Sequence, residues 1–295
     1  MIAAAEGASP TGVHAPSAGG IEGRLFIVGC SRSGTTLLQS FVAAHPAVLS
    51  FPETAVFGRL LWTDAEAQGA LNTIHQRTRL AYRRVSKLLD RLGRRDLEDL
   101  LPMRSKSIEE FGHGFVAVLD RLTLDRGKAW WVEKTPENIR YVPEIGRLVP
   151  GARFINILRD GRETVASLYG LALEYPDKFW TKFLDLDLAI EHWNVSLRHT
   201  RELAGVAEVM LVRYERLLAE TEAVLRGICE FAGLRFTREM LDRRSEVAPA
   251  LILEFETWKT RVLEAIPASS ESRFDQLFNA AQKAYIESRL EPIDF

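Results

Sequence analysis

The sequence predicts an α/β fold in which a parallel β-sheet is flanked by helices. The first observation is residues 24–28, a short run of β-branched and aromatic side chains that is typical of a buried parallel strand. Small residues fill the loop at 30–36, and the apolar segment at 37–42 has the composition of a buried helix. A strand, a small-residue loop and a helix in this order open a nucleotide-binding α/β unit.

Later segments continue the alternation of strands and helices. Residues 54–128 differ, because they place charged and apolar residues at helical spacing, with Gly93 as a stop. We interpret them as a helical insertion after the first strand–helix unit, or equally as a helical subdomain. The other predicted elements are strands at 129–132, 153–158 and 209–212, and helices at 163–173, 184–203 and 221–233, the last ending at Gly233.

Composition limits the classes of function. The 295 residues include 38 Lys and Arg and 40 Asp and Glu, a net charge of −2, so neither nucleic acid nor an anionic membrane is expected as the main partner. Cys30 and Cys229 are too few for a disulfide scaffold and lack metal-ligand spacing. Apolar runs fall short of the roughly 20 residues of a membrane span, so no membrane anchor is expected. We expect a disordered tail at 1–22 and a single domain at 23–295.

The loop after the first predicted strand has the residues of a phosphate site. Ser33, Gly34, Thr35 and Thr36 supply small side chains and hydroxyl donors where a helix begins, and Arg32 adds a guanidinium suited to a phosphate. The arrangement is P-loop-like, but a nucleoside-triphosphate loop has Lys after its glycine, where this chain has Thr35. A tight turn without a ligand does not account for an arginine and two threonines placed together.

A second predicted anion site begins at Arg159, at the end of a strand. Ser167 stands eight residues further on, along the following helix, so both side chains can converge on one anion. Together, residues 32–38 and 159–167 resemble the nucleotide motifs of sulfotransferases that use 3′-phosphoadenosine 5′-phosphosulfate (PAPS). The first motif resembles the 5′-phosphosulfate loop and the second the 3′-phosphate site. The resemblance implies PAPS as co-substrate and 3′-phosphoadenosine 5′-phosphate (PAP) as product.

The tyrosylprotein and related bacterial sulfotransferases are the branch that this sequence resembles most. The features shared with that branch are Arg32, the His45-Pro46 pair and Glu53, which stands 21 residues after Arg32. The resemblance extends over most of the chain and implies two more nucleotide contacts. Tyr214 resembles the family tyrosine beside the adenine, and Lys259, in Trp258-Lys259, resembles the late segment of the family that closes over the nucleotide.

Sulfuryl transfer to a hydroxyl benefits from a base for the acceptor proton and from cations at the leaving oxygen. The resemblance implies Glu53 as the base; without it, Glu53 would be a charge on a loop. Lys134 is assigned to the leaving oxygen, with Arg32 assisting at the 5′-phosphate. The alternative for Lys134 is a salt bridge with Glu133 or Glu137. Because side chains supply the positive charge, no metal is expected.

The acceptor stays open among a small molecule, a glycan, a lipid and a peptide. We expect residues 54–128 and 170–183 to read it, and we expect a cytoplasmic location. A P-loop kinase or NTPase is one alternative, but it would need a lysine after Gly34. A non-catalytic nucleotide-binding module is another, against which the presence of both Glu53 and Lys134 argues.

Three further residues bear on the predicted site. Ser31 stands where many relatives have proline before the arginine, a departure that would loosen the loop slightly. His45 is expected to cap or pack at a helix end rather than to act as a base. His113 lies between two glycines, whose flexibility is the one feature that would let it approach the acceptor.

Overall fold

The computed structural model describes residues 20–62, 73–103, 105, 107–176, 179–251 and 272–295. The expected tail therefore lies outside them except for its last three residues, and so does Lys259. The strands are β1 (Gly23–Gly29), β2 (Val48–Phe51), β3 (Trp130–Lys134), β4 (Ala152–Leu158) and β5 (Val209–Arg213). The α-helices are α1 (Thr35–Ala43), α2 (Val56–Leu61), α3 (Ile74–Leu92), α4 (Ile108–Asp125), α5 (Val142–Leu148), α6 (Gly161–Glu174), α7 (Leu186–Glu202), α8 (Tyr214–Ala219), α9 (Thr221–Ala232), α10 (Glu239–Asp242), α11 (Arg244–Val247), α12 (Arg273–Leu277) and α13 (Ala280–Glu287). The 3-10 helices are η1 (Arg95–Leu100), η2 (Pro136–Tyr141), η3 (Phe179–Leu184) and η4 (Ala248–Leu251).

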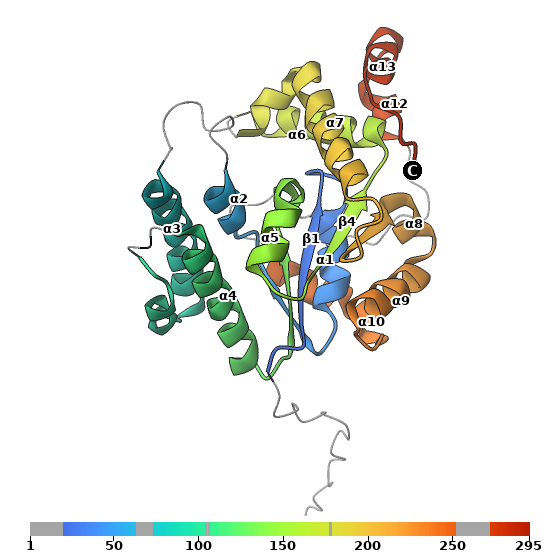
Figure 1. Cartoon of the computed structure of the whole chain (residues 1–295). Helices are drawn as coiled ribbons and strands as arrows, with labels where there is room; N and C mark the ends of the chain where they lie inside the picture. Colours follow the sequence, from blue (N-terminus) through green and yellow to red (C-terminus); the bar gives the residue numbers. More distant parts are fainter. Residues whose placement is uncertain (1–19, 63–72, 104, 106, 177–178, 252–271) are drawn as a thin grey trace, which may run out of the picture.

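The strands form one parallel sheet in the order β2–β3–β1–β4–β5 (Figure 1). This confirms the predicted parallel α/β fold. The chain adds β2 and β3 on one side of β1 and then crosses to β4 on the other, so the direction of construction reverses at β1. In such sheets ligands bind beyond the carboxyl ends of the strands, at the point of reversal.

Alternating side chains of each strand enter different cores on the two faces of the sheet. In β1, Phe26 belongs to the core under the insertion, whereas Leu25 and Ile27 belong to the core under α1 and α9. In β3, Trp131 belongs to the first of these cores and Trp130 to the second, and both are buried. This period of two is what a parallel sheet covered on both faces requires.

The helices of the insertion share a core with the sheet. Phe57 of α2 contacts Phe26 of β1 and Phe115 of α4, with ring centroids 5.7 and 5.5 Å apart. Helix α3 ends at Gly93, whose φ of 63° gives the left-handed stop that the sequence predicted. The insertion therefore covers one face of the sheet. The predicted division into a tail at 1–22 and a single domain at 23–295 stays a prediction.

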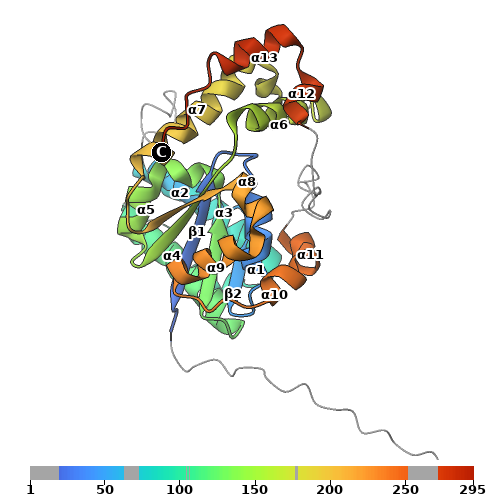
Figure 2. The same ribbon diagram turned by 90° about the vertical axis from the view of Figure 1, so that its right-hand side faces the viewer.

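A third group of helices lies over the carboxyl ends of the strands. Helices α6 and α7 and the C-terminal α12 and α13 stand together above the sheet in both views (Figures 1 and 2). They share a separate apolar core that includes Trp180, Phe274 and Phe278. Helices α6 and α7 were predicted from the sequence, whereas the C-terminal pair and the short strand β2 were not.

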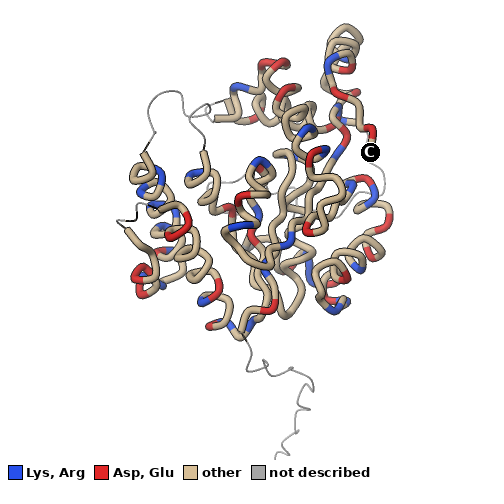
Figure 3. Tube along the Cα trace, in the orientation of Figure 1, with Lys and Arg blue, Asp and Glu red and all other residues tan. Residues whose placement is uncertain are grey.

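Charges of both signs are spread along the whole described trace (Figure 3). The 38 Lys and Arg and the 40 Asp and Glu of the sequence nearly balance, which gives the net charge of −2. Within the described ranges, none of the helices combines the length and the apolar composition that crossing a bilayer would take.

Candidate active site

The predicted site residues lie together at the carboxyl ends of the strands, because one segment of the site follows or ends each strand there. Residues 30–34 follow β1, Glu53 follows β2, and Lys134 ends β3. Arg159 follows β4, and Tyr214 follows β5. Residues that are far apart in the sequence thus reach one edge, as expected of parallel strands.

The loop after β1 turns sharply into α1. Arg32 has a φ of 74° and Gly34 a φ of 92°, so two residues of the loop are left-handed. Ser33 is fully buried and donates from its amide to the Cys30 carbonyl at 3.2 Å. The N terminus of α1 at Gly34 has no side-chain cap. First-turn amides of such a helix are donors for an anion, and Arg32 lies beside them.

Replacing Gly34 with Ala is expected to weaken PAP binding by at least about tenfold and to destabilise the fold by about 1–3 kcal/mol. An added Cβ would lie 2.3 Å from Cδ2 of the Tyr214 ring, and the φ of 92° disfavours any side chain. Calorimetric titration with PAP and chemical denaturation measure the two effects. The matched control is Gly93→Ala, since Gly93 also has a positive φ but nothing within 4 Å of its added Cβ. Equal behaviour of the two variants would contradict this account.

The two predicted anion motifs meet in the folded chain. Arg32 donates from Nε to the Ser167 hydroxyl at 3.2 Å. Arg159 donates from Nη1 to the Arg32 carbonyl at 3.3 Å, and its guanidinium lies 4.6 Å from the centroid of the Tyr214 ring. The two arginines, the serine and the tyrosine therefore surround one place, which has the positive charge and the hydroxyl donor that a phosphate group needs.

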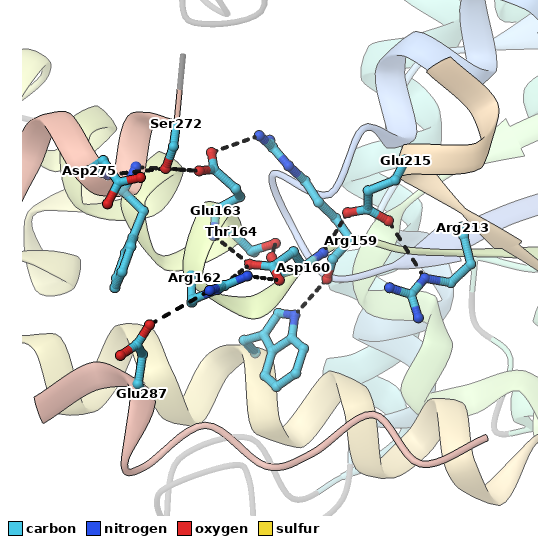
Figure 4. A network of polar contacts seen from close by, with 12 residues as sticks. Arg159, Asp160, Arg162, Glu163, Thr164, Arg213, Glu215, Ser272, Asp275 and Glu287 are labelled. Atoms are coloured by element: carbon cyan, nitrogen blue, oxygen red, sulfur yellow. Dashed lines mark hydrogen bonds and ion pairs between the residues drawn. The ribbon is translucent and has the colours of Figure 1, made fainter. Parts of the chain in front are cut away.

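Glu163 of α6 is a neighbour of this place that the sequence analysis did not identify. Figure 4 shows its carboxylate between Arg159 and the start of the C-terminal segment. Arg159 donates from Nη2 to Glu163 at 3.3 Å, and the Ser272 hydroxyl donates to the other carboxylate oxygen at 2.8 Å. Arg159 and Glu163 stand four residues apart, but Arg159 precedes α6, so helical spacing did not signal this ion pair.

The two residues predicted to act on the reacting groups form an ion pair. Lys134 donates from Nζ to the Glu53 carboxylate. The Lys134 side chain is 2% exposed and that of Glu53 is 28% exposed, so the cation lies inside the protein and the carboxylate faces solvent. Of the alternative partners, Glu137 accepts a hydrogen bond from Ser31 at 2.6 Å. Their catalytic roles stay predictions, but the structure places the two groups together.

Glu133 has a different position from the one considered in the sequence analysis. Its carboxylate is fully buried and accepts hydrogen bonds from Thr54, Thr135 and Asn138. Burial raises the pKa of the Glu133 carboxyl, and the hydrogen bonds from Thr135 and Thr54 oppose that shift. A glutamate and a lysine at the end of an otherwise apolar strand were the available signal.

His45 caps the chain after α1, as expected. Its Nδ1 accepts from the Ala47 amide at 3.1 Å, and its Nε2 lies 2.8 Å from the Arg235 carbonyl. His113 is exposed on α4, where its two neighbouring glycines are helical rather than in a flexible loop. The flexibility that would have brought His113 to the acceptor is therefore absent from the described helix.

His192 of α7 packs beneath the phosphate loop. Its carbonyl lies 3.9 Å from the Cys30 sulfur, and its ring centroid is 5.1 Å from that of Phe183. Its Nε2 is buried and has no hydrogen-bond partner among the described residues. Burial, followed by repulsion from Lys182 and Arg140, lowers the pKa of His192 to about 4.

This histidine predicts a loss of stability in acid. The folded protein binds the proton less tightly than the unfolded chain, whose histidine has a pKa of 6.5, so the free energy of unfolding falls as pH decreases through this range. Between about pH 7 and about pH 5 the loss attributable to His192 is about 2 kcal/mol. Denaturant titrations at both pH values measure it, and His192→Phe should show a correspondingly smaller change. An identical pH dependence in the variant would contradict the assignment.

Comparisons with known proteins agree with this geometry. A sequence model described as "Sulfotransferase family" matches residues 24–238. Protein-tyrosine sulfotransferase 1 of Danio rerio is 24% identical over 230 residues, which are 77% of this chain and 57% of that protein. Protein-tyrosine sulfotransferase A of Caenorhabditis elegans is 26% identical over 224 residues, 74% of this chain and 51% of that protein. The chain thus spans about half the length of these curated relatives.

Solved structures of sulfotransferases share the fold. The sulfotransferase domain of the Synechococcus PCC 7002 olefin synthase has a TM-score of 0.52 at 19% identity and covers 95% of this chain and 99% of that one. The sulfotransferase domain from the curacin biosynthetic pathway has a TM-score of 0.53 at 19% identity, with 93% and 100% covered. A mouse sulfotransferase in complex with PAP has a TM-score of 0.52 at 14% identity, with 90% and 82% covered. From the family match, with its tyrosylprotein-like relatives, this chain belongs to the sulfotransferase family.

Proposed function

We propose that the protein transfers a sulfuryl group from PAPS to an acceptor hydroxyl and releases PAP. The observation that carries this proposal is the meeting of both anion motifs beside the Glu53–Lys134 pair at one edge of the sheet. Family membership supports it, and so does the loop after β1, which lacks the lysine of a nucleoside-triphosphate site.

The residues present fit PAPS as the donor. Arg32, the hydroxyls of Thr35 and Thr36 and the first turn of α1 suit the 5′-phosphosulfate, because they combine positive charge with hydroxyl and amide donors. The Ser33 hydroxyl is buried and donates to the Cys30 carbonyl instead. Arg159 and Ser167 suit the 3′-phosphate, and Tyr214 offers a ring face to the adenine. Lys259 keeps its predicted role at the nucleotide, although it lies outside the described residues.

Glu53 and Lys134 have complementary tasks in the proposed transfer. Glu53 accepts the proton of the acceptor hydroxyl as its oxygen forms a bond to sulfur. Lys134 donates to the bridging oxygen that keeps the electron pair when the bond from sulfur to that oxygen breaks. Arg32 neutralises the charge that develops on the 5′-phosphate. The protein thus positions the groups and stabilises charge, as in phosphoryl transfer.

The acceptor is proposed to be a hydroxyl, read by residues 54–128 and 170–183. Since the curated relatives are named protein-tyrosine sulfotransferases, tyrosine-containing peptides come first in an acceptor panel, followed by phenols, glycans and lipids. The cytoplasmic location stays part of the proposal, and fractionation of the source cells tests it.

Transfer of label from radiolabelled PAPS to this panel, with EDTA present, tests the proposed function. We expect a labelled acceptor and stoichiometric PAP, without a requirement for magnesium. Binding of ATP with magnesium in place of PAP would overturn the proposal in favour of a kinase or NTPase. Tight binding of PAP with no transfer to any acceptor or to water would favour a non-catalytic nucleotide-binding module.

A further inference from the structure

The loop that carries Glu53 is fastened to the end of β3 by the buried carboxylate of Glu133. The Thr54 amide and hydroxyl donate to its Oε1 at 3.1 and 2.8 Å, and the Thr135 hydroxyl donates to the same oxygen at 2.6 Å. Asn138 donates to Oε2 at 3.1 Å. Glu133 thereby joins the segments that follow β2 and β3.

A second contact runs parallel to this one. The Ala55 amide donates to the Thr135 hydroxyl oxygen at 3.2 Å. Ala55 has a φ of 50°, a left-handed conformation that costs an alanine free energy and needs support from its surroundings. The two threonines are 6% and 3% exposed, so these bonds are shielded from water. The backbone on the carboxyl side of Glu53 is thus fixed at two successive amides.

These hydrogen bonds affect the proposed catalytic pair because they hold the residues next to Glu53 and Lys134 in the chain. Glu53 directly precedes Thr54, and Lys134 lies between Glu133 and Thr135 in the chain. Glu133 consequently holds the neighbours of both members of the pair in one hydrogen-bonded unit. Proton transfer and charge stabilisation both depend steeply on such placement, where an error of about 1 Å costs about 100-fold in rate.

We propose that Glu133 is a positioning residue of the sulfuryl-transfer site, which sets the distance between Glu53 and Lys134 by fastening Thr54 and Thr135. The inference rests on the proposed function for its effect on turnover. Its structural part, the fastening of Thr54, can be measured independently of any activity.

Two substitutions of Glu133 distinguish the effect of its shape from the effect of its charge. Asn138 has a buried Oδ1 without a hydrogen-bond partner among the described residues. In Glu133→Gln the new carbonyl can occupy the place of Oε1, and the new amide can donate to Asn138 once that side chain turns over. This variant therefore preserves the fastening, whereas Glu133→Ala removes it.

The experiment compares Glu133→Ala, Glu133→Gln and Thr135→Val with the wild type by three measurements. They are the PAP dissociation constant, the turnover of radiolabelled PAPS with saturating acceptor or water, and hydrogen exchange of the Thr54 amide. Glu222→Ala is the control for the glutamate, since Glu222 accepts from the Arg226 guanidinium on α9, outside the residues proposed to contact donor or acceptor. Thr221→Val is the control for the threonine, since the hydroxyl of Thr221, at the start of α9, donates to the Leu217 carbonyl, also outside those residues.

For Glu133→Ala we expect turnover to fall about 100-fold and Thr54 to exchange at least about tenfold faster. PAP affinity should stay within about twofold, because the donor site is built from other segments. Thr135→Val should change in the same direction, and it serves alone if Glu133→Ala does not fold. Glu133→Gln should retain turnover within about fivefold, and both controls should match the wild type.

Unchanged Thr54 exchange and turnover in Glu133→Ala would overturn the inference. A parallel loss of PAP affinity would also overturn it, because Glu133 would then support the whole site rather than the catalytic pair. A wild type that neither binds PAP nor consumes PAPS would refute the proposed function instead, and Thr54 exchange would still report whether Glu133 fastens the loop.

Discussion

Glu53→Gln should lower the rate of sulfuryl transfer about a thousandfold while leaving PAP affinity nearly unchanged. The substitution keeps the size of the side chain but removes both the proton acceptor and the negative charge that Lys134 contacts. A base that acts on the acceptor contributes to the transition state and little to donor binding, so the loss appears in turnover. Single-turnover measurements with radiolabelled PAPS and calorimetry with PAP provide the two values.

The control for this variant is Glu144→Gln. Glu144 lies on α5 and pairs with the exposed Arg147 at 3.5 Å, so its replacement should leave both values unchanged. If Glu53→Gln kept the turnover of the wild type, Glu53 would be the loop charge that the sequence alone would suggest. The proton would then go to another group or directly to water.

Arg32→Ala and Arg159→Ala should each weaken PAP binding about 100-fold. Each variant removes charged hydrogen bonds to a phosphate from a site where the other arginine remains. Removing Arg32 also frees the Ser167 hydroxyl from its contact, and removing Arg159 uncovers the Tyr214 ring. Calorimetric titration of PAP, in buffer containing EDTA, measures both.

Arg153→Ala provides the comparison. Arg153 lies near the start of β4, at the opposite end from Arg159, and its exposed side chain donates to the Phe231 carbonyl. Its removal should not change PAP affinity. Wild-type affinity in either Arg32→Ala or Arg159→Ala would exclude that arginine from the nucleotide site and separate the two motifs in function.

The elements that the sequence predicted have local causes. β1 and β4 are apolar runs buried on both faces, and Gly233 ends α9 with a φ of 80°, as Gly93 ends α3. β2 was missed because its four residues include Ser50, whose hydroxyl receives a hydrogen bond from Gln39 of α1. That bond depends on how a helix packs, which no local pattern records.

The candidate site likewise contains residues that local sequence motifs predicted and residues that they did not. The two anion motifs are contiguous in the chain, so their residues could be named before their meeting was seen. The hydrogen-bond partners of Glu133 could not be named in this way, because they come from segments on both sides of it, up to 79 residues away.

Helix α13 of the fold did carry a local signal that was not used in the prediction, namely the capping box between Asn279 and Gln282.

The unequal exposure of the Glu53–Lys134 pair determines how the enzyme returns to its starting state in the proposed reaction. Each transfer leaves one proton on Glu53, which has to be discharged before the next acceptor can react. The Glu53 side chain reaches solvent at 28% exposure, so water can remove that proton directly. Lys134, at 2%, is shielded from bulk water. A proton relay through further side chains is therefore unnecessary, and regeneration of the base depends on departure of the sulfated product.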